Sequence, residues 1–197
     1  ASISPVIKAD AEKSIIGFPF PSIDIKLVCF SAIVPVSGSA KITNAEAFKN
    51  VKTEKKLVIA GGASDTAEFE KKLKSTASED SRIIFTGFVQ GKIWRELYSN
   101  SYIYVLPSDV EGMPLSLLEA MSNGNCCLTS DISECSSVIG ECGITFRKGD
   151  ISDLTEKLQY LCDNPDIAEE YKSKSADYVC SKFNWNDIVD KTLEIYK

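Results

Sequence analysis

The sequence predicts an α/β domain with a doubly wound, mainly parallel sheet of about six strands and extra helices at its C-terminal end. Short apolar runs alternate with longer amphipathic stretches from about residue 26 onward. The apolar runs are continuous, as expected when helices cover both faces of a parallel sheet. After about residue 150 only helical spacing remains, which predicts the extra helices.

The expected strands, in chain order, are residues 26–30, 56–60, 82–85, 102–106, 126–129 and 143–146. Helical spacing predicts helices over 43–51, 65–75, 92–99, 115–123, 151–162, 167–181 and 185–196. Gly124 follows a predicted helix at a position that favours positive φ, and three residues are candidate N-caps: Asp150, Asp163 and Asn184.

Residues 1–25 contain Gly17-Phe18-Pro19-Phe20-Pro21, which interrupts any regular element. We therefore expect 1–25 to be an irregular lead-in or linker and 26–197 to form the domain. The chain begins at Ala1, without Met or the features of a signal peptide, which indicates a fragment or a processed start.

Composition excludes several classes of function. The 197 residues carry a net charge of -6 without a run of Lys or Arg, which argues against a nucleic-acid groove or a polybasic membrane patch. No stretch approaches the ~20 apolar residues that a membrane-spanning helix needs.

Histidine is absent, and the seven cysteines include no C-x-x-C pair. Without His, the chain lacks the commonest general base and the commonest metal ligand. Catalysis must then use carboxylates, backbone amides or groups on another domain. We expect the cysteines to be reduced, buried and apolar, as in a cytosolic protein.

Residues 102–131 carry the chemistry, because they predict a strand, a loop, a helix, a turn, a second strand and a polar loop. Ligands of open parallel sheets bind beyond the carboxyl ends of the strands, where 107–114 should lie. Gly112 allows a ligand to approach the backbone closely. The following residues should present free amides at a helix N-terminus, where the partial positive charge suits a diphosphate: Met113, Pro114 and Leu115.

Glu111 precedes this helix and Glu119 lies within it, eight positions or ~2.2 helical turns later, so both can face the same edge of a cleft. Carboxylates accept hydrogen bonds from the paired hydroxyls of a sugar or ribose. Either Glu alone is more often a cap or an exposed helical residue. The complete segment is far more specific than its two acids.

This segment resembles the E-x7-E signature of group 1 retaining glycosyltransferases, whose fold has two facing Rossmann-like domains. The resemblance runs from about residue 54 to the end, and 56–62 is similar to the family's strand and glycine turn. Residues 84–89 resemble its nucleotide-base-binding loop. Pro107-Ser108 and Phe183-Asn184-Trp185 also match the family pattern.

The resemblance implies roles for individual residues. Glu111, the candidate catalytic residue, would contact the donor sugar, Glu119 would contact the ribose, and the amides after Glu111 would hold the diphosphate. Further donor-binding candidates are Gly61, Gly62, Phe88 and Val89, of which the last two would lie beside the base. A core role is about as probable for Phe88, and the two glycines are equally compatible with a plain strand-to-helix turn.

The sequence departs from the family after its first strand. Ala32 stands where the family has an Arg and Ser37 where it has a Lys, both of which neutralise the diphosphate. Lys41 is a candidate substitute for phosphate binding. Further along, Glu134 and Ser137 replace a Gly and a Glu in the loop after Asp131.

The leading hypothesis is the C-terminal donor-binding domain of a cytoplasmic hexosyltransferase, which uses a UDP or GDP sugar without a metal or cofactor. The acceptor would be a saccharide, lipid or polysaccharide, as in polysaccharide biosynthesis. The family's N-terminal acceptor-binding domain has no counterpart here, so we expect the isolated chain to bind donor without transferring sugar. Any peripheral membrane association would come from that missing half.

Two alternatives remain open. Ala32 and Ser37 favour a catalytically inactive binding or scaffold protein that keeps the fold. An unrelated nucleotide-binding domain is less favoured, because no G-x-G-x-x-G turn follows a strand.

Overall fold

The structure is a computed structural model that describes residues 28–32, 38–60, 71, 75, 76, 78, 80–87 and 89–196. Side chains are described from Ile42 onward, apart from that of Trp185. The expected lead-in, most of the helix predicted over 65–75 and several candidate residues lie outside this part of the chain: Ser37, Gly61, Gly62 and Phe88.

Six parallel strands form one sheet in the order β3-β2-β1-β4-β5-β6. The strands are β1 (Val28–Ala32), β2 (Lys56–Ala60), β3 (Ile83–Gly87), β4 (Ser101–Leu106), β5 (Cys126–Ser130) and β6 (Gly143–Phe146). The predicted fold class is confirmed. Each predicted strand is present, with its ends displaced by at most two residues.

The helices are α1 (Gly38–Lys49), α3 (Gly91–Asn100), α4 (Leu115–Ser122), α5 (Ser133–Ile139), α6 (Ile151–Asp163), α7 (Pro165–Lys182) and α8 (Trp185–Ile195). Gly124 has the expected positive φ, 73°. Asp150 caps α6 and Asn184 caps α8 through their side chains, as predicted. Asp163 does not cap α7, because it is the last residue of α6 and Asn164 takes the N-cap position.

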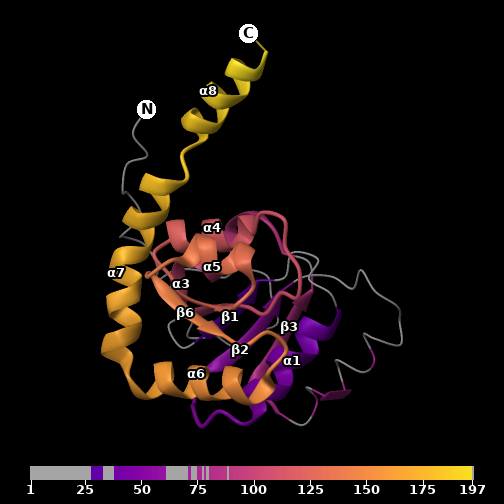
Figure 1. The fold of residues 1–197 in the computed structure, drawn as a ribbon. Helices are drawn as coiled ribbons and strands as arrows, with labels where there is room; N and C mark the ends of the chain where they lie inside the picture. The colour runs from indigo at the N-terminus through magenta and orange to yellow at the C-terminus, as the bar shows by residue number, and fades with distance from the viewer. Residues whose placement is uncertain are drawn as a thin grey trace.

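Both faces of the sheet are buried, because successive strand side chains enter opposite clusters. Val58, Tyr104 and Cys127 pack with α3, α4 and α5, whereas their chain neighbours pack with α1 and α6. Helix α7 passes beside β5 and contributes to both clusters, with Ala168 in one and Val179 in the other. Figure 1 shows these layers above and below the strands.

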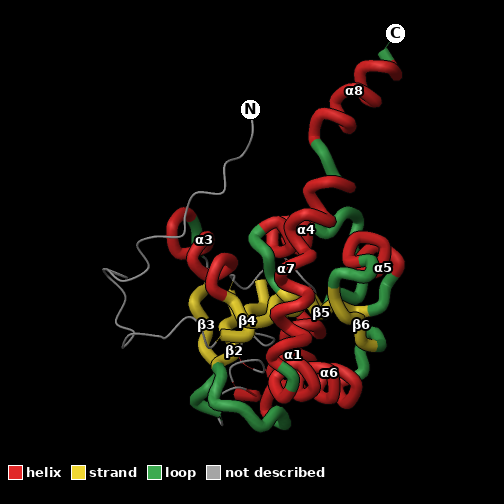
Figure 2. The backbone as a smooth tube through the Cα atoms, turned by 90° about the vertical axis from the view of Figure 1, so that its left-hand side faces the viewer, coloured by secondary structure: helices red, strands yellow, loops and turns green. Residues whose placement is uncertain are grey.

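Helix α8 extends away from the body of the domain (Figures 1 and 2). The side chains described along it are exposed. None of the described helices is long and apolar enough to cross a membrane.

The six cysteines whose side chains the structure describes are free. Cys162 is only half-buried, and four are buried as expected: Cys126, Cys127, Cys135 and Cys142. Burial raises the pKa of Cys126 and of Cys135 to about 12, so these thiols remain protonated core groups. Cys180 is exposed, which contradicts the expectation for that residue, because its position in α7 faces away from the core.

Candidate functional site

The sheet has a topological switch point between β1 and β4. From β1 the chain proceeds outward through β2 to β3, and it returns to the other side of β1 as β4. Ligands of doubly wound sheets bind in the crevice beyond the carboxyl ends of the strands at such a point. The loop 107–114 leaves β4 there and leads into α4. The sheet therefore places the predicted motif loop where ligands bind.

A chain of two serines holds Glu111 in place. The hydroxyl of Ser130, at the end of β5, donates to the carbonyl oxygen of Ser108 at 2.6 Å. The hydroxyl of Ser108 in turn donates to Oε1 of Glu111, also at 2.6 Å. Both serines are buried, whereas Glu111 is partly exposed. Glu111 thus faces the solvent from a backbone that the core fixes.

The start of α4 offers backbone donors, although not the set expected. Pro114 has no N–H, and the amide of Leu115 donates to the carbonyl oxygen of Met113 at 2.8 Å. The prediction that these two residues present free amides is therefore wrong. In the described part of the chain, no hydrogen bond is formed by the amides of Gly112, Met113 and Ser116. These three amides lie beside Glu111 at the positive end of the helix.

Gly112 leaves open space above this turn. A Cβ atom built at Gly112 would meet no atom within 4 Å, and the side chains of Met113 and Leu115 are 55% and 64% exposed. A ligand can therefore approach the Gly112 backbone without displacing atoms of the described residues.

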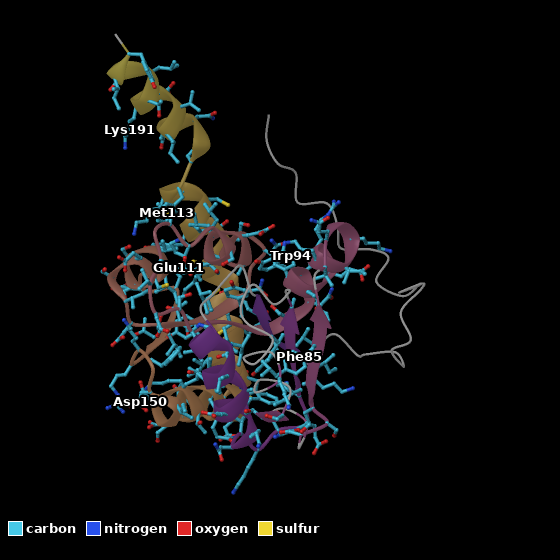
Figure 3. All side chains as sticks on the ribbon, turned by 90° about the vertical axis from the view of Figure 1, so that its right-hand side faces the viewer. Phe85, Trp94, Glu111, Met113, Asp150 and Lys191 are labelled. Carbon is cyan, nitrogen blue, oxygen red and sulfur yellow. The ribbon has the colours of Figure 1, made fainter. Side chains whose placement is uncertain are left out.

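Glu119 is exposed on α4 and contacts a residue that the sequence reasoning did not select. The indole N–H of Trp94, on α3, donates to Oε1 of Glu119 at 3.3 Å. The Trp94 ring packs edge-on against Tyr98, with ring centroids 4.9 Å apart. Figure 3 shows Trp94, Glu111 and Met113 toward the same end of the sheet, with Asp150 lower in the same view.

Two stacked tyrosines lie beneath the two carboxylates. The rings of Tyr98 and Tyr104 are 5.7 Å apart, and the Tyr98 hydroxyl donates to the carbonyl oxygen of Ser116 at 3.3 Å. Burial raises the pKa of both tyrosines well above its ordinary value, and the charge of Glu119 near Tyr98 acts in the same direction. For Tyr104 the nearby charge is Glu111. The two carboxylates thus flank one neutral aromatic pair.

The other candidate residues are less informative. Val89 packs in the core on the α3 side and is 9% exposed. Ala32 ends β1, and Lys41 lies in the first turn of α1, near the carboxyl end of β1. Glu134 and Ser137 do not lie in a loop as predicted, because 133–139 forms α5.

The sequence contained signals for the residues that were missed. Ser130 ends a buried strand whose first three residues are apolar, and it lies next to the motif loop. Trp94 lies on the helix that precedes the motif strand, with Tyr98 one turn later. The Ser130 contact depends on the pairing of β5 with β4, and the Trp94 contact depends on the packing of α3 against α4. Local spacing reveals neither.

A pocket of about 1050 Å³ lies elsewhere, between the C-terminal end of α1 and the side of α6. Gln159, in its wall, already exchanges hydrogen bonds with the backbone of Lys52 and donates to Asp163. Thr155 donates to backbone carbonyls. These polar groups are engaged in holding α1 to α6, so we favour the switch point as the functional site.

The fold and the site define a class, namely doubly wound α/β domains with a ligand site at the switch point. Residues 26–164 match the family described as Glycosyl transferases group 1, which is more than half of the chain. The chain therefore belongs to the group 1 glycosyltransferases, as the sequence motif indicated.

The chain spans less than half the length of the following relatives. The alpha-maltose-1-phosphate synthase of Mycolicibacterium smegmatis is 27% identical over 160 residues, covering 72% of this chain and 40% of the synthase. A glycosyltransferase structure from Rickettsia africae matches with a TM-score of 0.77 at 20% identity, over 86% of this chain and 47% of that one. Anabaena HepE in complex with UDP and glucose matches with a TM-score of 0.74 at 15% identity, over 86% and 48%.

Proposed function

We propose that the chain is the nucleotide-sugar donor-binding domain of a retaining glycosyltransferase, which moves a sugar to a saccharide, lipid or polysaccharide acceptor. One observation carries the proposal: a carboxylate fixed by Ser108 lies beside the unbonded amides of Gly112 and Met113, at the switch point of the sheet. A fixed acceptor next to fixed donors suits a sugar linked to a diphosphate.

Each part of the site has a proposed partner in the donor. The amides of Gly112, Met113 and Ser116 hold the diphosphate, whose charge increases as the sugar departs. Glu111 accepts hydrogen bonds from the sugar hydroxyls, and Glu119 accepts them from the ribose. HepE, which shares the fold, was solved with UDP and glucose, and this supports a UDP-type donor.

The rest of the enzyme is proposed to lie outside this chain. The chain spans 40% of the synthase and 47% of the Rickettsia protein. We propose that an N-terminal domain binds the acceptor and that the present chain alone binds donor without transferring sugar. No metal or cofactor has a role in this proposal, and the enzyme is proposed to act in the cytoplasm.

A catalytically inactive, donor-binding scaffold is the second candidate. It is favoured by Ala32 at the end of β1, where family members carry an Arg that neutralises the diphosphate. Lys41, in the first turn of α1, is the proposed cation that compensates for this loss. Sugar transfer by the longer protein that contains this chain distinguishes the two functions, because the scaffold binds donor without turnover.

The proposed function is tested by calorimetric titration of the chain with UDP, UDP-glucose and GDP-mannose. Glu119→Ala should weaken binding of UDP itself about 10-fold, since a charged acceptor is lost. Glu111→Ala should leave UDP binding nearly unchanged and weaken the UDP-sugar.

Glu156→Ala, on helix α6, is the matched control for both carboxylate variants, because Glu156 is exposed and lies outside the motif. It should bind like the wild type. Absence of binding to every nucleotide at millimolar concentration would refute the donor-domain function. Normal binding by both motif variants would refute the assigned roles.

A further inference from the structure

Trp94 is an aromatic residue on α3 whose polar atom contacts a motif carboxylate. Its indole N–H donates to Oε1 of Glu119 at 3.3 Å, across the boundary between α3 and α4. One turn later on α3, the hydroxyl of Tyr98 donates to the carbonyl oxygen of Ser116 in the first turn of α4. Two consecutive turns of α3 therefore contact α4.

The Trp94 ring is held by packing as well as by its hydrogen bond. It contacts the Tyr98 ring edge-on, with an interplanar angle of 85°, and Tyr98 is buried against Tyr104. The aromatic cluster thus fixes the direction in which the indole N–H points. A rigid donor can orient a flexible acceptor, whereas an exposed Glu without one samples several rotamers.

Glu119 needs such a partner, because it is exposed and lies in the second turn of α4. A carboxylate offers about four lone-pair positions. The single N–H of Trp94 occupies one of them and leaves acceptor capacity for two hydroxyls. The neutral donor also leaves the negative charge of Glu119 in place.

We propose that Trp94 is a positioning residue that directs Glu119 toward the paired hydroxyls of a ribonucleoside diphosphate. This inference rests on the proposed donor-binding function. It identifies a recognition element for the ribose, supplied by α3, that lies outside the E-x7-E motif. The element strengthens binding of ribonucleotides and contributes nothing to nucleotides that lack the ribose hydroxyls.

The test combines one substitution with two ligands. Trp94→Phe keeps an aromatic ring against Tyr98 and removes the N–H. Calorimetry with UDP should show binding weakened about 3- to 10-fold, which is the net effect of one ordinary hydrogen bond. With 2′,3′-dideoxy-UDP, wild type and Trp94→Phe should bind equally. The ratio of the two dissociation constants is insensitive to any loss of folded protein.

A double-mutant cycle supplies the second readout. If Trp94 acts through Glu119, then Trp94→Phe should add no further loss in a Glu119→Ala background. Trp94→Leu is measured in parallel, in case the smaller aromatic ring packs poorly. GDP and 2′,3′-dideoxy-GDP form a second ligand pair.

The outcomes separate this inference from the proposed function. Equal losses for UDP and its dideoxy form, or additive losses with Glu119→Ala, would overturn the positioning role while leaving donor binding intact. Failure of the wild type to bind UDP and GDP would overturn both.

Discussion

The hydroxyl of Ser108 decides where the Glu111 carboxylate lies. Ser108 is 1% exposed, and its backbone is held by the hydroxyl of Ser130 at the end of the adjacent strand. The position of Glu111 is therefore determined by the sheet through two hydrogen bonds. Fixing an acceptor before the ligand arrives lowers the entropic cost of binding.

Ser108→Ala should weaken UDP-sugar binding about 10-fold and lower the free energy of unfolding by only about 1 kcal/mol, because Glu111 can be solvated once the hydroxyl is gone. Calorimetry and urea denaturation measure the two effects. Ser122→Ala is the control, because the exposed Ser122 hydroxyl donates only within its own helix, to the carbonyl oxygen of Glu119. Unchanged affinity in Ser108→Ala would contradict the positioning of Glu111 by this serine.

Gly112→Val should abolish donor binding without loss of stability. The added side chain would enter space in which, chain neighbours aside, no atom of the described residues lies within 4 Å of the Cβ position, and that space is proposed to hold the ligand. Gly143→Ala is the contrasting control, because its Cβ would lie 2.6 Å from the carbonyl oxygen of Cys127. The midpoint temperature of thermal unfolding should fall only in Gly143→Ala. Retained donor binding by Gly112→Val would place the ligand elsewhere.

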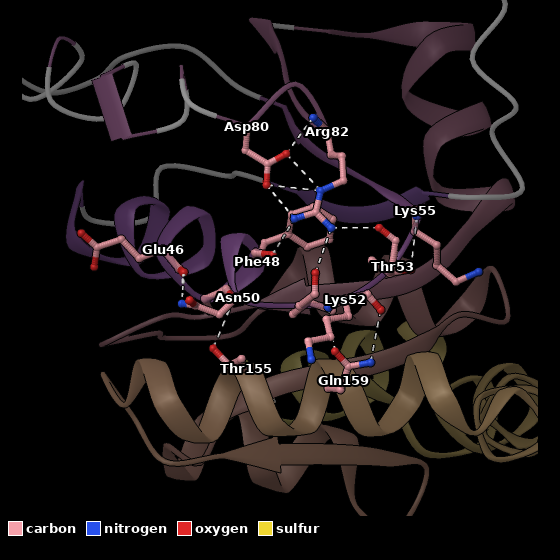
Figure 4. Close-up of polar contacts among 12 residues, drawn as sticks. Glu46, Phe48, Asn50, Lys52, Thr53, Lys55, Asp80, Arg82, Thr155 and Gln159 are labelled. Carbon is pink, nitrogen blue, oxygen red and sulfur yellow. Dashed lines mark hydrogen bonds and ion pairs between the residues drawn. The ribbon is translucent and has the colours of Figure 1, made fainter.

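Arg82 links the segment after α1 to the start of β3 through hydrogen bonds and an ion pair (Figure 4). Its Nη1 donates to the carbonyl oxygens of Val51 and Thr53, each at 2.8 Å, and its guanidinium pairs with Asp80 at 2.7 Å. One side chain thus satisfies backbone acceptors of the α1–β2 connection. The network stabilises the edge of the sheet remote from the motif loop.

Asp80 gives this edge a dependence on pH. The Arg82 guanidinium donates to Asp80 and holds the pKa of that carboxyl below its usual range. The ion pair therefore stabilises the fold fully above the unfolded pKa of ~3.9, and this contribution is lost as pH falls through the lower folded pKa.

Asp80→Asn should lower the free energy of unfolding by about 1 kcal/mol at pH 7, since Asp80 and Arg82 are only partly exposed. The difference from wild type should shrink as pH falls below ~4. Urea denaturation at several pH values measures it, with Asp177→Asn, an exposed position on α7, as the control. A difference that does not change with pH would contradict the ion-pair account.

Sequence patterns predicted the six strands of the sheet but missed the short helix α5. The strands were predicted because continuous apolar runs reflect burial on both faces, as at Leu57 and Val58. Helix α5 was missed because its seven residues include three serines, which have weak helix propensity. Its buried residues nevertheless show helical spacing: Cys135, Val138 and Ile139. Tertiary packing, which a local pattern does not contain, completes this helix.

The strand order of the sheet determines where the motif lies in the molecule. A sequence motif predicted Glu111 and Glu119, but the order β3-β2-β1-β4-β5-β6 shows that their loop leaves the sheet at its switch point. The contacts that orient the two carboxylates come from Ser108 and Trp94, the second on another helix. Such contacts follow from packing between distant segments and were not predictable from spacing.

Binding of a nucleoside diphosphate at the switch point can be located residue by residue through NMR titration of the ¹⁵N-labelled chain with UDP. We expect the largest chemical-shift changes at the amides of Gly112, Met113 and Ser116 and at the indole N–H of Trp94. Changes confined to the α6 pocket around Lys52 and Gln159, or no changes at millimolar UDP, would rule out nucleotide binding at the switch point.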